Sequence, residues 1–244
     1  MRICARGEPE RGAAVRAEQA AELLGNTDLF ADLDRSALLS LGERALERRY
    51  KKGQIIFHQG DLGDTLYVLA EGTVKVFVTS EHGDEMVLAT LHPPDTLGEL
   101  AVIDGGPRSA SAETLEPATL LALTRPTLLE LLEGSRALTD ALLRSIGNMV
   151  RRLTEQASDL VFLDLYGRVA KLLLGFADSR GREAEDGIVL DLAMTQTDLA
   201  AMVGGSRQSV NQILRRFEKR GIVELRGRTV VIKEPALLRR RAGI

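Results

Sequence analysis

The chain has 244 residues, of which 44% are hydrophobic and 27% charged, and its net charge is −3 at neutral pH. These values are ordinary for a soluble globular protein, and the length allows one large or two medium domains. A single cysteine, Cys4, excludes an intrachain disulfide and an iron–sulfur cluster or zinc site built on cysteines. No apolar run approaches about 18 residues and the first 20 residues lack an apolar core, so we expect a cytoplasmic protein without a membrane span or signal peptide.

The charge is unevenly distributed along the chain. Residues 194–244 contain eleven Lys/Arg and four Asp/Glu, a net charge of +7, which leaves −10 for residues 1–193. A basic C-terminal quarter is expected when one end of a protein meets a polyanion, although a solvated face alone would give the same count.

The N-terminal half changes its hydrophobic period twice. Residues 1–20 mix both charge signs and are expected to be flexible, and leucines at helical spacing predict short helices between residues 21 and 48. From residue 49 to 124 the period is two and glycines separate short segments, which predicts a small antiparallel barrel or jelly roll. The predicted strands are 55–57, 66–69, 74–78, 86–90, 110–113 and 119–123, followed by a helix at 126–132.

An apolar repeat with steps of four and three residues runs through residues 138–163. This 3.5-residue period predicts a long helix with one stripe facing a partner helix, so we expect a homodimer. Three heptads are short for such a pattern, and an ordinary core helix is the alternative. The predicted dimer residues are Leu142, Ile146, Met149, Leu153, Leu160 and Leu163.

Residues 98–110 interrupt the strand pattern. Gly98 ends a strand, residues 99–103 can form one helical turn, and Arg108 and Ser109 follow shortly after. A helix start, an arginine and a hydroxyl favour an anion, for which phosphate is the natural ligand. Glu99 suits a sugar hydroxyl, so the residues favour a sugar phosphate; the alternative is a loop in which Glu99 and Arg108 form an ion pair.

The C-terminal residues predict a winged helix-turn-helix. A capping pattern at 195–198 opens one helix, two glycines form a turn, a second helix runs over 206–220, and strands at 222–225 and 229–232 form a hairpin. The outer side chains of the second helix favour base reading over protein docking. The predicted DNA-binding residues are Ser206, Arg207, Gln208, Ser209, Asn211, Gln212 and Arg215, with Arg216, Lys219, Arg220, Arg226 and Arg228 as phosphate contacts.

These motifs resemble those of a known family. The phosphate-binding cassette of cyclic-nucleotide-binding domains is similar to GELA at 98–101 followed by PRSA at 107–110. The helix-turn-helix and hinge of the cyclic AMP receptor protein (CRP/FNR) family of bacterial transcription regulators are similar to TQTDLAAMVGGSRQSVNQILRRFEKRGIV and FLDLYGRVA.

The resemblance implies a DNA-binding homodimer whose allosteric effector is cyclic AMP or a related cyclic nucleotide, with no required cofactor. Its implied partners are a pseudo-palindromic double-stranded DNA site and RNA polymerase. The implied ligand-binding residues are Gly98, Glu99, Leu100, Arg108, Ser109 and Thr154.

The expected fold class is therefore α+β, in four parts. A flexible extension at 1–20 precedes a cyclic-nucleotide-binding β-roll (jelly roll) at 21–136. A dimerisation helix at 137–163 follows, and a winged helix-turn-helix at 164–244 completes the chain.

The long helix departs from the family pattern at two positions. Leu153 and Thr154 stand where the cyclic AMP receptor carries the Thr and Ser that touch adenine. Thr154 can keep one contact, whereas Leu153 cannot donate a hydrogen bond. We therefore expect the identity or the affinity of the ligand to differ from that of the cyclic AMP receptor.

The helix-turn-helix departs from the pattern as well. Arg207 matches the family, but Gln208 and Gln212 replace its Glu and Arg. Because Arg suits guanine and Gln suits adenine, we expect half-sites that keep one guanine and differ elsewhere. Gln196 replaces an arginine that reaches the DNA backbone, which predicts a slightly weaker salt dependence.

Two alternatives and one exclusion complete the sequence-based view. The same fold could carry a degenerate nucleotide site and bind DNA without ligand, or it could be a cyclic-nucleotide-binding module that acts on a protein partner. The chain has no nucleophile–base arrangement, metal-ligand spacing or Walker-type loop, so we expect neither an enzyme nor a metal site.

Overall fold

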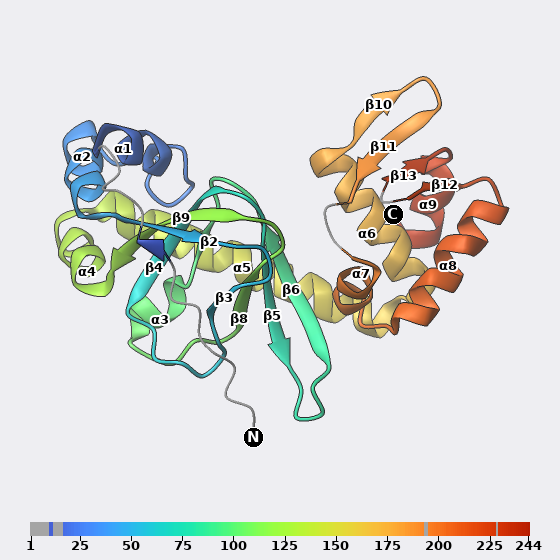
Figure 1. The fold of residues 1–244 in the computed structure, drawn as a ribbon, viewed down its shortest axis with the longest axis horizontal. Coiled ribbons are helices and arrows are strands. Elements are labelled where there is room, and N and C mark those ends of the chain that lie inside the picture. The colour runs from blue at the N-terminus through green and yellow to red at the C-terminus, as the bar shows by residue number, and fades with distance from the viewer. Residues whose placement is uncertain (1–9, 12–16, 193–194, 228) are drawn as a thin grey trace. The chain divides into compact units, whose positions relative to one another are not determined.

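The computed structural model describes residues 10–11, 17–192, 195–227 and 229–244 (Figure 1). Cys4, Arg228 and most of the expected N-terminal extension lie outside the described residues. Contacts divide the chain into two units, residues up to 78 with 88–150, and residues 79–87 with 151–244. Each unit has its own set of buried apolar side chains.

The first unit is a two-sheet β-roll with helices gathered at one end, where Figure 1 shows α1, α2 and α4. One sheet has the order β1-β2-β9-β4-β7 and the other the order β3-β8-β5-β6. The strands are β1 (Glu10–Arg11), β2 (Leu46–Tyr50), β3 (Ile55–Phe57), β4 (Thr65–Glu71), β5 (Val74–Thr79), β6 (Glu85–Leu91), β7 (Thr96–Leu97), β8 (Ser111–Thr114) and β9 (Ala118–Thr124). The helices are α1 (Ala17–Gly25), α2 (Arg35–Arg44), α3 (Glu99–Asp104) and α4 (Arg125–Gly134), and α5 (Arg136–Phe162) begins in this unit.

The central strands β4 and β9 are buried on both faces. Along β4, Leu66 and Val68 join the core under the helices, whereas Tyr67 and Leu69 join the core inside the roll. Successive side chains of a strand point to opposite faces, so two cores require the near-continuous apolar run of this segment. Strand β4 thus separates the core inside the roll from the core under the helices.

Helix α1 begins within the segment that the sequence predicted to be flexible. It starts at Ala17, and Ala20 is 1% exposed. Glu10 and Arg11 pair with β2 as the edge strand β1. The prediction of a flexible extension is therefore wrong for residues 17–20, because an amphipathic helix there packs onto α2.

The second unit consists of helices and a four-stranded sheet of order β10-β11-β13-β12. Its helices beyond α5 are α6 (Leu165–Arg180), α7 (Gln196–Met202), α8 (Arg207–Lys219) and α9 (Pro235–Ala242). Its strands are β10 (Arg182–Ala184), β11 (Gly187–Asp191), β12 (Val223–Arg226) and β13 (Thr229–Ile232). Among the described residues, no helix combines the length and the apolar character needed to span a bilayer.

Helix α5 confirms the predicted long helix, but the first two residues of the predicted apolar stripe pack inside the first unit. Leu142 is 6% exposed and belongs to the first unit's own core, and Ile146 packs partly against that core. Leu163 lies one residue beyond the helix end. Leu142 is therefore corrected from a partner-facing residue to a core residue of the first unit. Later members of the repeat, Leu153 and Leu160, are each 42% exposed, and their contact with a partner stays a prediction. The other exposed apolar side chains of α5 include Leu143 at 62% and Val150 at 56%.

We expect Leu142→Ala to lower the free energy of unfolding by about 2–5 kcal/mol, because it leaves a cavity in a packed core. Leu62→Ala is the control, since that leucine is 90% exposed, and its effect should stay within about 0.5 kcal/mol. Urea denaturation at one fixed protein concentration measures both changes. Equal losses for the two variants would contradict the assignment of Leu142 to the core.

Candidate nucleotide and DNA sites

A loop pairing places Arg108 inside the first unit. Leu62 and Pro107 form an isolated bridge, the Gly60 N–H donates to the Arg108 carbonyl at 2.8 Å, and the Arg108 N–H donates to the Asp61 carbonyl at 2.8 Å. These bonds hold the backbone of residue 108 against the loop that precedes β4. The side chain is thereby directed inward and is 5% exposed.

The Arg108 guanidinium is held by backbone carbonyls. Nη1 donates to the Gly98 carbonyl at 2.7 Å and Nη2 to the Thr65 carbonyl at 2.6 Å. Nε is buried without a hydrogen-bond partner among the described residues. The alternative of a loop with a Glu99–Arg108 ion pair did not include these two backbone acceptors.

Burial has an electrostatic cost at this position. Desolvation lowers the pKa of Arg108 from its ordinary value, while Tyr67, Asp64, Glu99 and others act in the opposite direction. A buried cation with an unsatisfied donor is unfavourable, and a bound anion that accepts from it offsets this cost. The Arg108 Nε–H is therefore a buried donor that the described residues leave unsatisfied, and an anion that accepts from it would offset the cost.

Two glycines make room for the guanidinium. Gly98 has φ +86°, and a Cβ there would lie 2.3 Å from Arg108 Nη1. A Cβ on Gly63 would lie 2.7 Å from Arg108 Nε. Sequence reasoning identified Gly98 but missed the role of Gly63, whose only signal was its place in a glycine-rich run.

Aromatic side chains cover the guanidinium from one side. The Arg108 guanidinium lies 4.3 Å from the centroid of the Phe57 ring, a cation–π contact. Phe57 in turn stacks on Tyr67, with ring centroids 6.1 Å apart. Neither residue was predicted to belong to the site, because each also fits the inward face of a strand.

The other predicted ligand residues surround this arginine only in part. Helix α3 begins at Glu99 as predicted, with Gly98 as its N-cap residue. Glu99 is buried at 6% exposure, whereas Ser109 is exposed. Leu100 is partly buried, and Thr154 is exposed on the part of α5 that belongs to the second unit.

The predicted helix-turn-helix has the expected caps. The Thr195 hydroxyl accepts from the Asp198 N–H, and the Asp198 carboxylate accepts from the Thr195 N–H at 2.8 Å, which forms a capping box. Ser206 caps α8 by accepting from the Ser209 N–H at 3.1 Å. The inward side chains of α8 are all buried: Val210, Ile213, Leu214 and Phe217.

Four of the seven predicted DNA-binding side chains are exposed without a role in the motif's own capping. They are Arg207, Gln208, Gln212 and Arg215. Ser206 and Ser209 bond each other through their hydroxyls at 2.8 Å. The half-buried Asn211 donates through Nδ2 to Gln196 Oε1 at 2.9 Å and accepts from Arg215 Nε at 3.1 Å. Asn211 thus links the two helices of the motif.

Two of the predicted phosphate contacts are engaged within the protein. Arg216 donates to the Tyr166 hydroxyl, and Arg226 pairs with Glu224 and Asp186. Lys219 and Arg220 are exposed near the end of α8. In the part of the chain that the structure describes, no cluster of His, Cys, Asp or Glu could hold a metal ion.

Comparisons with known proteins address both units. Residues 47–135 match the model of the Cyclic nucleotide-binding domain, and residues 167–241 match that of the Crp-like helix-turn-helix domain. A CRP-like cAMP-activated global transcriptional regulator of Mycobacterium tuberculosis is 33% identical over 221 residues, which cover 91% of this chain and 99% of that protein.

The chain belongs to the CRP/FNR family of transcription regulators.

Other members of the CRP/FNR family are similar over most of their length. A Cyclic AMP receptor protein of Thermus thermophilus is 35% identical over 78% of this chain and 85% of that protein. The solved structure of a CooA mutant from Carboxydothermus hydrogenoformans is 25% identical, with a TM-score of 0.72 over 82% of this chain and 88% of that one. The predicted fold class, a β-roll followed by a long helix and a C-terminal helix-turn-helix, is confirmed.

We expect Gly98→Ala to weaken anion binding at Arg108 by at least about tenfold, because the new Cβ displaces Nη1 from its charged hydrogen bond. Gly83→Ala is the matched control: its φ of +87° brings the same backbone strain, yet nothing lies within 4 Å of the new Cβ. Titration with cyclic AMP, followed by fluorescence or heat, compares the two variants. Similar losses in both would attribute the effect to backbone strain rather than to the clash.

Proposed function

We propose that the protein is a cytoplasmic, homodimeric regulator whose sequence-specific DNA binding is controlled by cyclic AMP or a related cyclic nucleotide at Arg108. The observation that carries this proposal is the buried Arg108 guanidinium with its unsatisfied Nε. A cyclic phosphate supplies the acceptor oxygens and the negative charge that this position lacks. The names of the Mycobacterium and Thermus relatives support cyclic AMP as the first nucleotide to test.

Glu99 supports a ribose rather than a bare phosphate. Its side chain is buried in the first turn of α3, next to the Gly98 carbonyl that binds Arg108. A carboxylate repels a phosphate but accepts well from a hydroxyl, so a ligand with both groups fits the pair of charged side chains. We infer that Glu99 takes the ribose 2′-hydroxyl and that Gly98, Leu100 and Ser109 border the phosphate.

The exposed apolar side of α5 supports the homodimer. Leu143 is 62% exposed and Leu153 is 42% exposed on the same long helix. Such side chains gain free energy when a second copy of the helix covers them. We place Met149, Leu153 and Leu160 at this interface, together with Leu143 in place of Leu142.

The second candidate is a regulator that binds DNA without a nucleotide. The observation that favours it is Leu153, which cannot hydrogen-bond a base and is exposed on α5. In this case Arg108 would serve only to anchor α3 to β4. RNA polymerase is the proposed protein partner for either candidate.

Calorimetric titration of the purified dimer with cyclic AMP tests the nucleotide. We expect binding that Arg108→Gln weakens by about tenfold to a hundredfold, because charged hydrogen bonds to the phosphate are lost. Arg44→Gln is the control, since Arg44 pairs with Glu130 on the surface of the same unit. Cyclic GMP and cyclic dinucleotides form parallel arms, which identify the effector if cyclic AMP does not bind.

Two outcomes would contradict the proposal. Equal affinity of the parent protein and Arg108→Gln for the nucleotide would show that its phosphate does not bind at Arg108. Failure of every nucleotide to bind, together with DNA binding by the unliganded protein, would establish the nucleotide-independent regulator instead.

Selection from random duplex DNA tests the reading residues. We expect half-sites with a guanine whose preference over other bases falls by about 1–3 kcal/mol in Arg207→Ala. Lys219→Ala should instead weaken all sequences alike and reduce the salt slope by about 1. Recovery of the cyclic AMP receptor's usual half-site would contradict the predicted roles of Gln208 and Gln212.

A further inference from the structure

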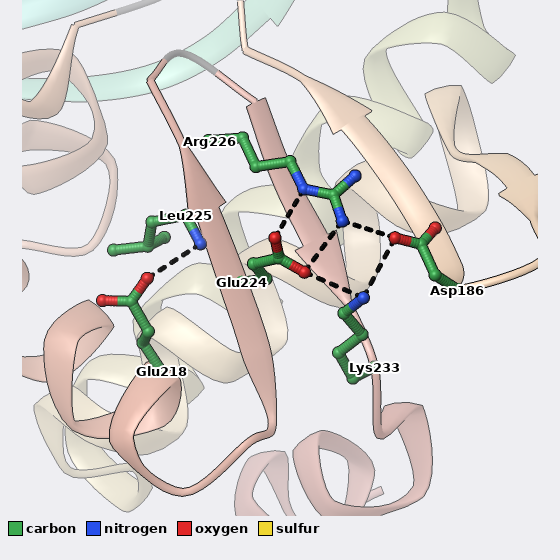
Figure 2. A network of polar contacts seen from close by, with 6 residues as sticks. All are labelled: Asp186, Glu218, Glu224, Leu225, Arg226 and Lys233. Atoms are coloured by element: carbon green, nitrogen blue, oxygen red, sulfur yellow. Dashed lines mark hydrogen bonds and ion pairs between the residues drawn. The ribbon is translucent and has the colours of Figure 1, made fainter.

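The sheet of the second unit, β10-β11-β13-β12, carries a cluster of four charged side chains that pair with one another (Figure 2). They are Asp186, Glu224, Arg226 and Lys233. Arg226 donates from Nε to Glu224 Oε1 at 2.6 Å and from Nη2 to Glu224 Oε2 at 2.9 Å. The same Nη2 lies 2.5 Å from Asp186 Oδ2. Lys233 Nζ completes the cluster at 3.0 Å from Asp186 Oδ2 and 2.9 Å from Glu224 Oε2.

The cluster is electrically neutral although it contains two of the cations of the basic C-terminal quarter. Hydrogen bonds from Arg226 and Lys233 lower the pKa of Glu224 to about 2, and bonds from the same two residues lower the pKa of Asp186. Both carboxylates are therefore ionised at neutral pH. Two positive and two negative charges cancel at this position.

The cluster lies on the sheet whose strand β12 is bonded to α8, the second and DNA-reading helix of the helix-turn-helix. Arg226 ends β12, directly before the hairpin tip, and the Leu225 N–H donates to Glu218 Oε1 of α8 at 3.1 Å (Figure 2). The side chains of Arg226 and Asp186 remain 48% and 40% exposed. A polyanion can therefore reach them from solvent.

A DNA phosphate gains little from such a cluster. A phosphate that approaches Arg226 meets the two carboxylates that accept from its Nε and Nη2, and their negative charges repel the phosphate. Affinity for any DNA sequence depends on the number of phosphates that protein cations neutralise, because each one releases counterions. Base discrimination depends on other side chains, namely those on the outer face of α8.

We propose that Asp186 and Glu224 are specificity-determining residues, which keep Arg226 and Lys233 from DNA phosphates and so limit nonspecific binding. The inference rests on the DNA-binding part of the proposed function. It replaces the prediction that Arg226 contacts the DNA backbone. The ratio of specific to nonspecific affinity is thus set partly by carboxylates that touch no base.

The test uses the full-length protein and a mixed-sequence DNA duplex, with binding followed by fluorescence anisotropy at several salt concentrations. We expect the double variant Asp186→Asn/Glu224→Gln to steepen the slope of log affinity against log salt by about 1 to 2. Its nonspecific affinity at moderate salt should rise by about tenfold. The ratio of operator affinity to nonspecific affinity should fall accordingly.

The matched control is Glu183→Gln/Glu185→Gln, which changes the net charge by the same amount on the β10–β11 hairpin that also carries Asp186. Both carboxylates are exposed and form no ion pair with any described residue. We expect this control to leave the salt slope nearly unchanged. Arg226→Ala should remove about half of the gain when it is added to the Asp186→Asn/Glu224→Gln variant.

Three results would overturn the inference: an unchanged slope in Asp186→Asn/Glu224→Gln, an equal effect of the control pair, or a flatter slope for Arg226→Ala in the parent protein. Thermal melting checks that the double variant is folded. If it is not, the single variant Asp186→Asn is expected to give about half of the effect, and no effect there is equally decisive. Failure of the parent protein to bind any duplex would instead refute the DNA-binding proposal, and this inference with it.

Discussion

Burial of the Arg108 guanidinium is the constraint on which the first unit depends. A charged group taken out of water must find strong polar partners, and here two backbone carbonyls supply them. Those carbonyls belong to Gly98 and Thr65, which are far apart in the chain, so the site exists only when the roll is closed. Under the proposed function, folding and nucleotide recognition depend on the same contacts, and a nucleotide bound at Arg108 would also stabilise the junction between α3 and β4.

In the second unit, several cations form ion pairs or hydrogen bonds with neighbouring side chains. The C-terminal quarter has a formal net charge of +7 for eleven cations, yet several of those cations are committed within the fold. Arg226 and Lys233 belong to the neutral cluster, and Arg216 donates to Tyr166. Arg226 and Lys233 therefore contribute little to the field that DNA encounters, and the exposed cations of α8 contribute a larger share of it.

The sequence predicted those features whose signals are local. The strand at 55–57, the helical turn at Glu99 and the caps at Thr195 and Ser206 were all recognisable from spacing and side-chain chemistry. Strand β2 was missed, because its charged residues resemble a loop until β9 pairs with them. The true orientation of Leu142 and the internal role of Asn211 were missed for the same reason. Each depends on a partner that is distant in the sequence, and periodicity cannot distinguish the chain's own core from a second subunit.

The contacts of Asp164 and Tyr166 connect the start of α6 with two other helices of the second unit. Asp164 caps α6 by accepting from the Gly167 N–H at 2.8 Å and also binds Arg241 of α9 at 2.5 Å. The ring of Tyr166 lies within cation–π distance of both Arg241 and Arg216, the latter on the recognition helix. Side-chain contacts thus join the first turn of α6 to both α9 and α8. A rotation of the first turn of α6 would therefore act directly on α8 through the contact of Tyr166 with Arg216, and on α9 through the bond of Asp164 with Arg241.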